Sequence, residues 1–144
     1  MDIIISIKPE WVHKIISGEK TIELRKSFPK QITPFRCFMY VPQDFSNYRG
    51  NNDYVWASRG KIIGAVNVVK DITTHSLGYY KQCGDDCLSD WEREGYLGGK
   101  VGHGWLLRNV KVYDTPRPLS DFGLSRPPQS WCYAQYYNKQ FIGA

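Results

Sequence analysis

The first 26 residues constrain the fold more than any other stretch, because they specify two strands with a helix between them. Residues 2–7, "DIIISI", are mostly β-branched and stop shortly before Pro9, as a strand would. Pro9 suits the first turn of a helix and Gly18 suits its C-cap, so we expect a helix over 9–17. The next run, "KTIELRK" at 20–26, alternates like a second strand. A chain that begins in this way packs an early helix close to a sheet.

Further strands follow, and one of them contains a glycine that indicates a bend. Strand-like runs occupy 35–42, 61–72 and 104–114, and a last short strand or coil is expected at 132–137. Gly64 lies inside the second of these runs and predicts a bulge or a tight bend. Long strands with such bends suit barrel closure. We therefore predict a small mixed-topology β-barrel of five or six strands, with the first helix near one mouth.

The segments between the later strands have less regular patterns. In 88–95, Ser89 is followed three residues later by Glu92, which is a capping box and predicts a short helix. The remainder of 73–103 shows no clear period, and 115–134 is too rich in proline for a regular element. No stretch divides the chain, so we expect one domain over its whole length.

Composition limits the classes of partner without selecting one. The chain has 144 residues, a net charge of +5 and 15% aromatic residues. This modest basic excess permits an RNA or nucleotide partner, and the aromatic content leaves rings for stacking surfaces. No apolar run reaches the length of a membrane span and the N-terminus does not resemble a signal peptide, so we expect a cytoplasmic protein without a membrane partner.

The second strand gathers charge on one face. Strand alternation places Thr21, Glu23 and Arg25 together, with Lys26 next to them. Glu23 and Arg25 can pair inside a cleft and contact a small polar ligand, and the plainer alternative is a solvated face with a weak salt bridge. We predict a partly buried pair kept for recognition, so that Glu23→Gln would disturb folding little and abolish function.

Lys20 has two interpretations of its own. Strict alternation places it with Ile22 and Leu24, where partial burial would make it a nucleophile or a base. The alternative is a lysine that extends from the strand edge into solvent. Catalysis by Lys20 together with Glu23 requires a twist or bulge that brings both into one cleft.

Two tryptophans are candidate stacking surfaces for a base. Trp131 follows the rigid stretch "PPQS", and Trp56 lies near Arg59, which would add a cation for single-stranded RNA. Each tryptophan has a core-packing alternative, and for Trp131 we favour it.

The cysteines and histidines do not form a recognisable metal or catalytic motif. Cys83 and Cys87 have C-x3-C spacing, flanked by His75 and His103, but zinc sites more often combine tighter pairs. We expect no metal and no cofactor.

The opening motif resembles the ASCH domain family of the PUA-like superfamily, in its phage and bacterial form. That family carries G-x-K-T-x-x-x-R on the strand after the first helix, which corresponds here to Gly18, Lys20, Thr21 and Arg25. The similarity continues more weakly through "GKIIGAVNVV", "GWLLRNVKVYDTPRPLSDF" and "RPPQSWCY". It implies a PUA-like barrel with a cleft beside the first helix, and the handling of RNA or a modified nucleoside.

The resemblance also implies a possible activity. Some small bacterial ASCH proteins are amidohydrolases that remove the acetyl group of N(4)-acetylcytidine with a lysine, a threonine and a glutamate. Lys20 matches the lysine, whereas Glu23 stands at the threonine position and would act as an acid or base. The distant glutamate has no aligned counterpart, and four residues remain open for it: Asp85, Asp86, Glu92 and Glu94.

Three functions are therefore compatible with the sequence. The first is a module that binds RNA or a modified nucleoside, in which cations contact phosphate or carbonyl groups and Glu23 accepts from an exocyclic amine. The second is a small amidohydrolase in which Lys20 and Glu23 transfer protons and Arg25 supports an oxyanion. The third is a phage-encoded protein-interaction domain.

Overall fold

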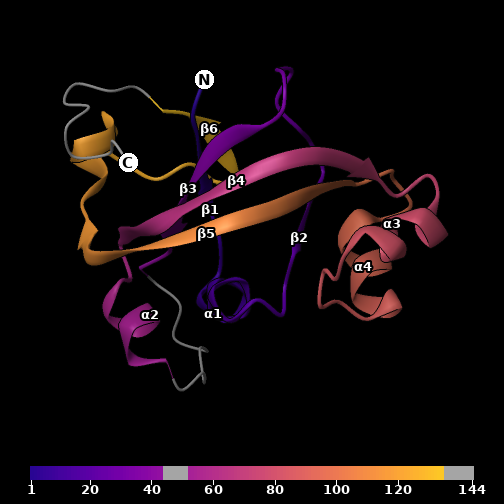
Figure 1. Cartoon of the computed structure of the whole chain (residues 1–144), viewed down its shortest axis with the longest axis horizontal. Helices are drawn as coiled ribbons and strands as arrows, with labels where there is room; N and C mark the ends of the chain where they lie inside the picture. Colours follow the sequence, from indigo (N-terminus) through magenta and orange to yellow (C-terminus); the bar gives the residue numbers. More distant parts are fainter. Residues whose placement is uncertain (44–51, 135–144) are drawn as a thin grey trace.

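The computed structural model describes residues 1–43 and 52–134, which form one curved six-stranded sheet with short helices around it (Figure 1). The strands are β1 (Ile3–Ser6), β2 (Ile22–Arg25), β3 (Phe35–Val41), β4 (Lys61–Thr73), β5 (His103–Arg117) and β6 (Trp131–Tyr133). The helices are α1 (Pro9–Ser17), α2 (Asp53–Ala57), α3 (Leu77–Cys83), α4 (Asp90–Leu97) and the 3-10 helix η1 (Leu119–Phe122). No helix among the described residues is long and apolar enough to cross a membrane.

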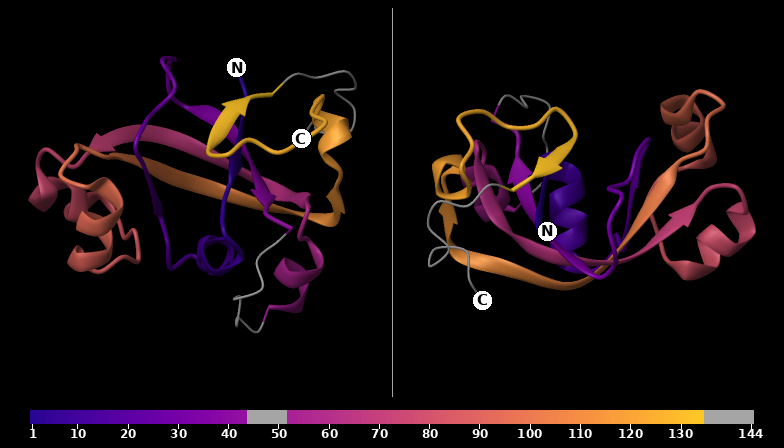
Figure 2. Two further views of the ribbon diagram at one scale, coloured as in Figure 1. Left: turned by 180° about the vertical axis from the view of Figure 1, so that it is seen from behind. Right: turned by 90° about the horizontal axis from the view of Figure 1, so that it is seen from above.

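The sheet is mixed, and its two longest strands determine its curvature. The strand order is β2-β5-β4-β3-β1-β6, with β1 and β3 parallel and the other neighbours antiparallel. The predicted bend at Gly64 is confirmed, because the register of β4 against β5 shifts there and an added Cβ would collide with the carbonyl of Lys111. From above, β4 and β5 curve around the rest of the sheet (Figure 2).

The predicted β-barrel of five or six strands is confirmed as a strongly curled half-barrel of six strands. The edge strands β2 and β6 have no backbone pairing with each other within the described ranges. The barrel is closed there by side chains instead, as described below for Arg25. A side of the sheet that lacks a strand ladder is where a cavity can form.

The concave face holds the main core and fixes α1. Val12 and Ile15 of α1 are buried against Trp105, which has no exposed surface. Phe28 and Phe35 meet the Trp105 ring edge-on, with ring centroids 5.1 and 6.0 Å away. This packing explains the helical period of residues 9–17 and fixes α1 against the sheet.

The opposite face has a second core, which organises the proline-rich segment. Phe122 of η1 is fully buried and meets Phe38 edge-on at 4.7 Å between ring centroids. Tyr113 packs in the same cluster, where burial raises its pKa to about 12. The stretch expected to be wholly irregular therefore contains the end of β5 and η1, since strand pairing continues to Arg117.

Helices α3 and α4 lie together at one end of the β4–β5 hairpin (Figures 1 and 2). The capping box of Ser89 and Glu92 at the start of α4 is confirmed. Helix α3 was not predicted, because its sequence "LGYYKQC" buries only Tyr80 and so has no apolar period. Tyr80 and Leu97 form a third buried cluster with Ile22 of β2. The two helices are thereby attached to the strand that carries the candidate site.

Candidate ligand-binding site

A pocket of about 760 Å³ opens between the two edges of the curled sheet. One edge of the sheet supplies β2, and the other supplies the end of β1 and the turn before β6. Helices α1 and α4 form two further walls. The volume lies in the range typical of sites for small organic ligands.

Three charged side chains form the floor, and all come from the motif on and just before β2. Glu23 Oε2 accepts from Nε of Arg25 at 2.9 Å and from Nη2 at 2.6 Å. Glu23 Oε1 lies 3.4 Å from Nζ of Lys20. The side chains of Lys20, Glu23 and Arg25 are only 2, 7 and 11% exposed. The predicted burial of Glu23 next to Arg25 is therefore confirmed.

Arg25 uses its donors within the protein. Besides Glu23, it donates from Nη2 to the carbonyl of Ser6 at 2.6 Å and from Nη1 to the hydroxyl and carbonyl oxygens of Ser130 at 3.1 and 3.5 Å. A guanidinium has five N–H groups, and these five hydrogen bonds account for them. Arg25 therefore connects β2 to the opposite sheet edge and orients Glu23, rather than offering a donor to a ligand.

Lys20 is held from three directions. Its Nζ donates to the carbonyl oxygen of Asp86, faces Glu23 Oε1 and lies 5.0 Å from the centre of the Trp11 ring. The described residues supply two oxygen partners for its three N–H groups, so one donor remains for a ligand. Together, Lys20 and Glu23 Oε1 present a donor and an acceptor side by side at the pocket floor.

The strict alternation expected for Lys20 is wrong. β2 begins at Ile22, and Lys20 precedes it in the turn that follows α1, where its backbone N–H bonds the carbonyl of Lys14. Side-chain alternation applies only inside a strand. The turn therefore places Lys20 on the same side as Glu23, which is the arrangement that joint action of the two residues requires.

The walls are aromatic, and the sequence did not predict them. Trp11 of α1 lies on one side, and Trp91 and Tyr96 of α4 lie on another. Trp91 is 83% exposed, so its ring contributes little to folding. Burial raises the pKa of Tyr96, so its hydroxyl stays protonated near neutral pH. The sequence signal was a tryptophan in the first turn of the helix that the Ser89 capping box predicts, and the fold then shows that its exposed ring has no packing role.

The remaining predicted site residues are not all at the pocket. Thr21 accepts from the backbone N–H of Asp85 at 3.0 Å and joins two chain segments. The ammonium of Lys26 lies 5.0 Å from the ring centre of Tyr96, which lines the pocket, whereas Lys26 itself does not. Trp131 does not line the pocket, since its indole bonds the hydroxyl of Ser27 at 2.9 Å and its ring meets Trp105. The stacking role considered for Trp131 is thus replaced by the core-packing alternative.

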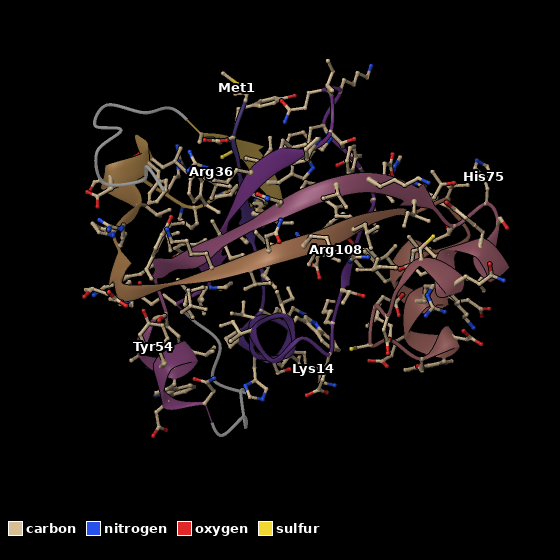
Figure 3. All side chains as sticks on the ribbon, viewed as in Figure 1. Met1, Lys14, Arg36, Tyr54, His75 and Arg108 are labelled. Atoms are coloured by element: carbon tan, nitrogen blue, oxygen red, sulfur yellow. The ribbon has the colours of Figure 1, made fainter. Side chains whose placement is uncertain are left out.

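Trp56 and Arg59 form a separate surface at α2. The Arg59 guanidinium lies 3.7 Å from the centre of the Trp56 ring, and both line a smaller hollow of about 540 Å³. Trp56 is 39% exposed. In Figure 3, Tyr54 marks this helix, on the opposite side of α1 from α4. Any contact of Trp56 with a ligand is therefore additional to the pocket.

The residues considered for a metal do not converge. Among residues 1–43 and 52–134, no three histidine, cysteine, aspartate or glutamate side chains are grouped as a metal site would require. Cys83 and Cys87 are free thiols. His103 pairs with Asp71 at 3.0 Å, and His75 lies beside α3 at one end of the molecule (Figure 3).

The four candidates for a distant acid differ in what their carboxylates bind. Asp86 is buried, and its carboxylate binds Arg93 and Tyr80. Glu92 lines the pocket, but its Oε1 accepts from the backbone N–H of Ser89 at 3.0 Å, which lowers its pKa. Asp85 accepts from the backbone of Cys87, and Glu94 is exposed on α4. By contrast, the carboxylate of Glu23 lies 3.4 Å from Nζ of Lys20, so Glu23 is the better candidate for an acid or base that acts together with Lys20.

The whole chain resembles solved structures of an ASCH protein. Residues over 98% of this chain superpose on 92% of ASCH from Zymomonas mobilis, with a TM-score of 0.73 and 21% sequence identity. A serine-to-alanine variant of that protein gives a TM-score of 0.74 at 20% identity over 98% of this chain and 93% of the other. A tyrosine-to-phenylalanine variant gives 0.73 at 20% over 98% and 95%. No family model and no curated protein sequence matches the chain.

The chain therefore shares its curled half-barrel fold with these structures. The chain has the ASCH fold, and the resemblance found in its opening motif is confirmed at that level. The similarity covers the α3–α4 region as well, which the sequence motif did not reach.

Proposed function

We propose that the pocket binds a single unpaired nucleobase, presented by RNA or by a modified nucleoside. The observation that supports this most is the buried pair of Lys20 and Glu23, whose donor and acceptor lie 3.4 Å apart beneath aromatic walls. The hydrogen-bonding edge of a base also presents a donor next to an acceptor. Lys20 would donate to a ring nitrogen or carbonyl, and Glu23 Oε1 would accept from an amine or ring N–H.

The depth of the pair favours a base that has left any helical stack. A base inside a duplex has its edge occupied by its partner, whereas single-stranded loops and ends allow a base to enter a pocket. Trp11 and Trp91 stand where they can cover the faces of a planar ring. Stacking of one base on an aromatic ring contributes about 1–3 kcal/mol, and this accounts for a tryptophan that the free protein leaves 83% exposed.

Titration of short fluorescein-labelled single-stranded RNAs, followed by anisotropy at low salt, tests the proposal. Wild type is expected to bind, and Lys20→Met and Trp91→Ala are expected to weaken binding about tenfold or more. Tyr79→Ala is the matched control, since Tyr79 is 47% exposed on α3 and does not line the pocket. Failure of wild type to bind any of several sequences would remove the proposal.

A second candidate, a small amidohydrolase, is favoured by the contact between Lys20 and Glu23. Here Glu23 would take a proton from water as it attacks the acyl carbon of an N-acylated nucleobase, and would return the proton to the leaving amine. The products are a carboxylic acid and the free base. Because the donors of Arg25 are occupied, the developing oxyanion would be stabilised by Lys20.

Incubation with N(4)-acetylcytidine and chromatographic detection of cytidine tests this candidate. Hydrolysis that disappears in both Lys20→Met and Glu23→Gln would support it. Binding of the nucleoside without release of cytidine would rule out the amidohydrolase and leave the binding module as the remaining candidate.

A further inference from the structure

Asp86 contacts the pocket lysine through its backbone and α4 through its side chain. Its carbonyl oxygen accepts from Nζ of Lys20. Its carboxylate, almost completely buried, accepts from Tyr80 at 2.7 Å, from Arg93 at 2.8 and 2.9 Å, and from the N–H of Leu88 at 3.0 Å. Burial alone would raise the pKa of Asp86, but the hydrogen bonds from Arg93 and Tyr80 outweigh it and lower the pKa, so the group stays ionised.

The segment that carries Asp86 is docked tightly on the chain that carries Lys20. The carbonyl of Asp85 accepts from the backbone N–H groups of Thr21 and Ile22 at 2.9 and 3.1 Å. The Asp85 N–H donates to the hydroxyl of Thr21 at 3.0 Å. Gly84 lies so close that an added Cβ would be 2.5 Å from that hydroxyl oxygen. Movement of this segment would therefore displace the oxygen that orients Lys20.

Arg93 connects the carboxylate of Asp86 to α4, the helix that forms the aromatic wall. It lies on α4 between Trp91 and Tyr96, which both line the pocket, yet its own side chain is buried under the helix. Its fork binds Asp86 through Nε and Nη2, which fixes the rotation of the helix better than a single contact would. Nη1 also binds Asp90 at 2.6 Å, at the surface.

We propose that Asp86 and Arg93 are positioning residues of the pocket, which hold the Lys20 ammonium and the wall of α4 in one fixed arrangement without touching the ligand. The proposal rests on the binding function argued above, because it assigns these residues a role in that same site. Neither residue lines the pocket. The affinity of the pocket for its ligand should thus depend on the buried ion pair of Asp86 and Arg93, which lies behind the wall formed by α4.

The first test needs no ligand. Lys20 is labelled with an amine-acylating reagent, and the rate at that residue is read by mass spectrometry, with exposed Lys30 as the internal reference. Asp86→Asn keeps the backbone carbonyl oxygen that binds Lys20 but removes the charge that holds Arg93. The labelling rate of Lys20 should therefore rise about tenfold, which corresponds to the loss of one charge-assisted hydrogen bond. Asp90→Asn is the matched control, because Asp90 also binds Arg93 but its side chain is 64% exposed, and no rise is expected.

Arg93→Lys provides a second variant that keeps the charge and loses the fork, and an intermediate rise is expected. All rates are taken well below the thermal midpoint of each variant. A Lys20 rate unchanged in Asp86→Asn and in Arg93→Lys would overturn the proposal, even if both variants melt earlier, because that result describes stability alone.

The second test measures affinity for the labelled single-stranded RNA. Asp86→Asn should weaken binding about tenfold, whereas Asp90→Asn should bind like wild type. Wild-type affinity in Asp86→Asn would overturn the positioning role. If wild type itself does not bind, the proposed function fails, while the labelling result still decides whether Asp86 positions Lys20.

Discussion

Replacement of Glu23 by glutamine should cost more stability than the strand pattern suggested. From the sequence, little change in folding was expected for Glu23→Gln. The structure places the carboxylate between two buried cations, with Oε2 on Arg25 and Oε1 towards Lys20. A glutamine has one acceptor oxygen, and its NH₂ group would face one of the cations.

The size of the effect follows from that geometry. Removal of one partner from a buried ion pair costs about 3–5 kcal/mol. Because the pocket opens to solvent, we expect the lower end, about 3 kcal/mol, which is roughly a 10 °C fall in thermal midpoint for a chain of this size. The control Glu94→Gln changes an exposed glutamate of α4 and should stay within about 0.5 kcal/mol of wild type.

Urea unfolding followed by circular dichroism gives the free energy, and the same protein is used for RNA titration. Lys20→Met/Glu23→Gln should recover part of the lost stability, because one of the two uncompensated cations is gone. Equal stabilities of Glu23→Gln and Glu94→Gln would refute the buried arrangement. A variant that is destabilised but binds RNA normally would refute the role of Glu23 in recognition.

Three further predictions concern pH, salt and pocket size. The pKa of Asp86 in the folded protein lies below its ordinary value of 3.8. The ionised Asp86 therefore contributes its full stabilisation above about pH 3.8, and this contribution is lost as the pH falls through the lower folded pKa. In an acid titration of unfolding, Asp86→Asn should not show this loss of stability. In salt titrations of RNA binding, Lys26→Ala should lower the slope by about one if its ammonium meets a phosphate, whereas Arg25→Ala should weaken binding with the slope unchanged, because its donors are used internally. Gly95 lies at the pocket wall, and an added Cβ there meets nothing within 4 Å, so Gly95→Leu should abolish RNA binding without loss of stability. The control Gly78→Leu on α3, where an added Cβ is equally free, should bind RNA normally. Equal RNA binding by both variants would contradict the assignment of the pocket as the binding site.

The parts of the fold that depend on local pattern were predictable. Pro9 and Gly18 delimit α1, and the Ser89 box starts α4, because caps are set by one or two residues. The bend at Gly64 was equally local. Helix α3 could not be found, since it is held by Tyr80 in a cluster whose other buried members lie in β2, β4, β5 and α4.

Only the part of the candidate site that lies on one strand was predictable from the sequence. Glu23 and Arg25 share a strand, so their pairing follows from alternation. The role of Asp86 depends on contacts more than 60 residues away in sequence, and nothing in "GDDC" distinguishes its carboxylate from that of Asp85. Trp91 needed the fold to show that its exposed ring faces the same pocket as Lys20.

The five tryptophans allow the most direct measurement of the central claim, that an unpaired base enters the pocket. Their indole N–H signals in a nitrogen-15 correlation spectrum report the pocket (Trp11, Trp91), the surface of α2 (Trp56) and the core (Trp105, Trp131). On titration with single-stranded RNA, the signals of Trp11 and Trp91 should shift together and saturate at one stoichiometry, while that of Trp105 stays in place. Shifts confined to Trp56, or no shift at Trp11 and Trp91 under conditions where RNA binds, would contradict the account.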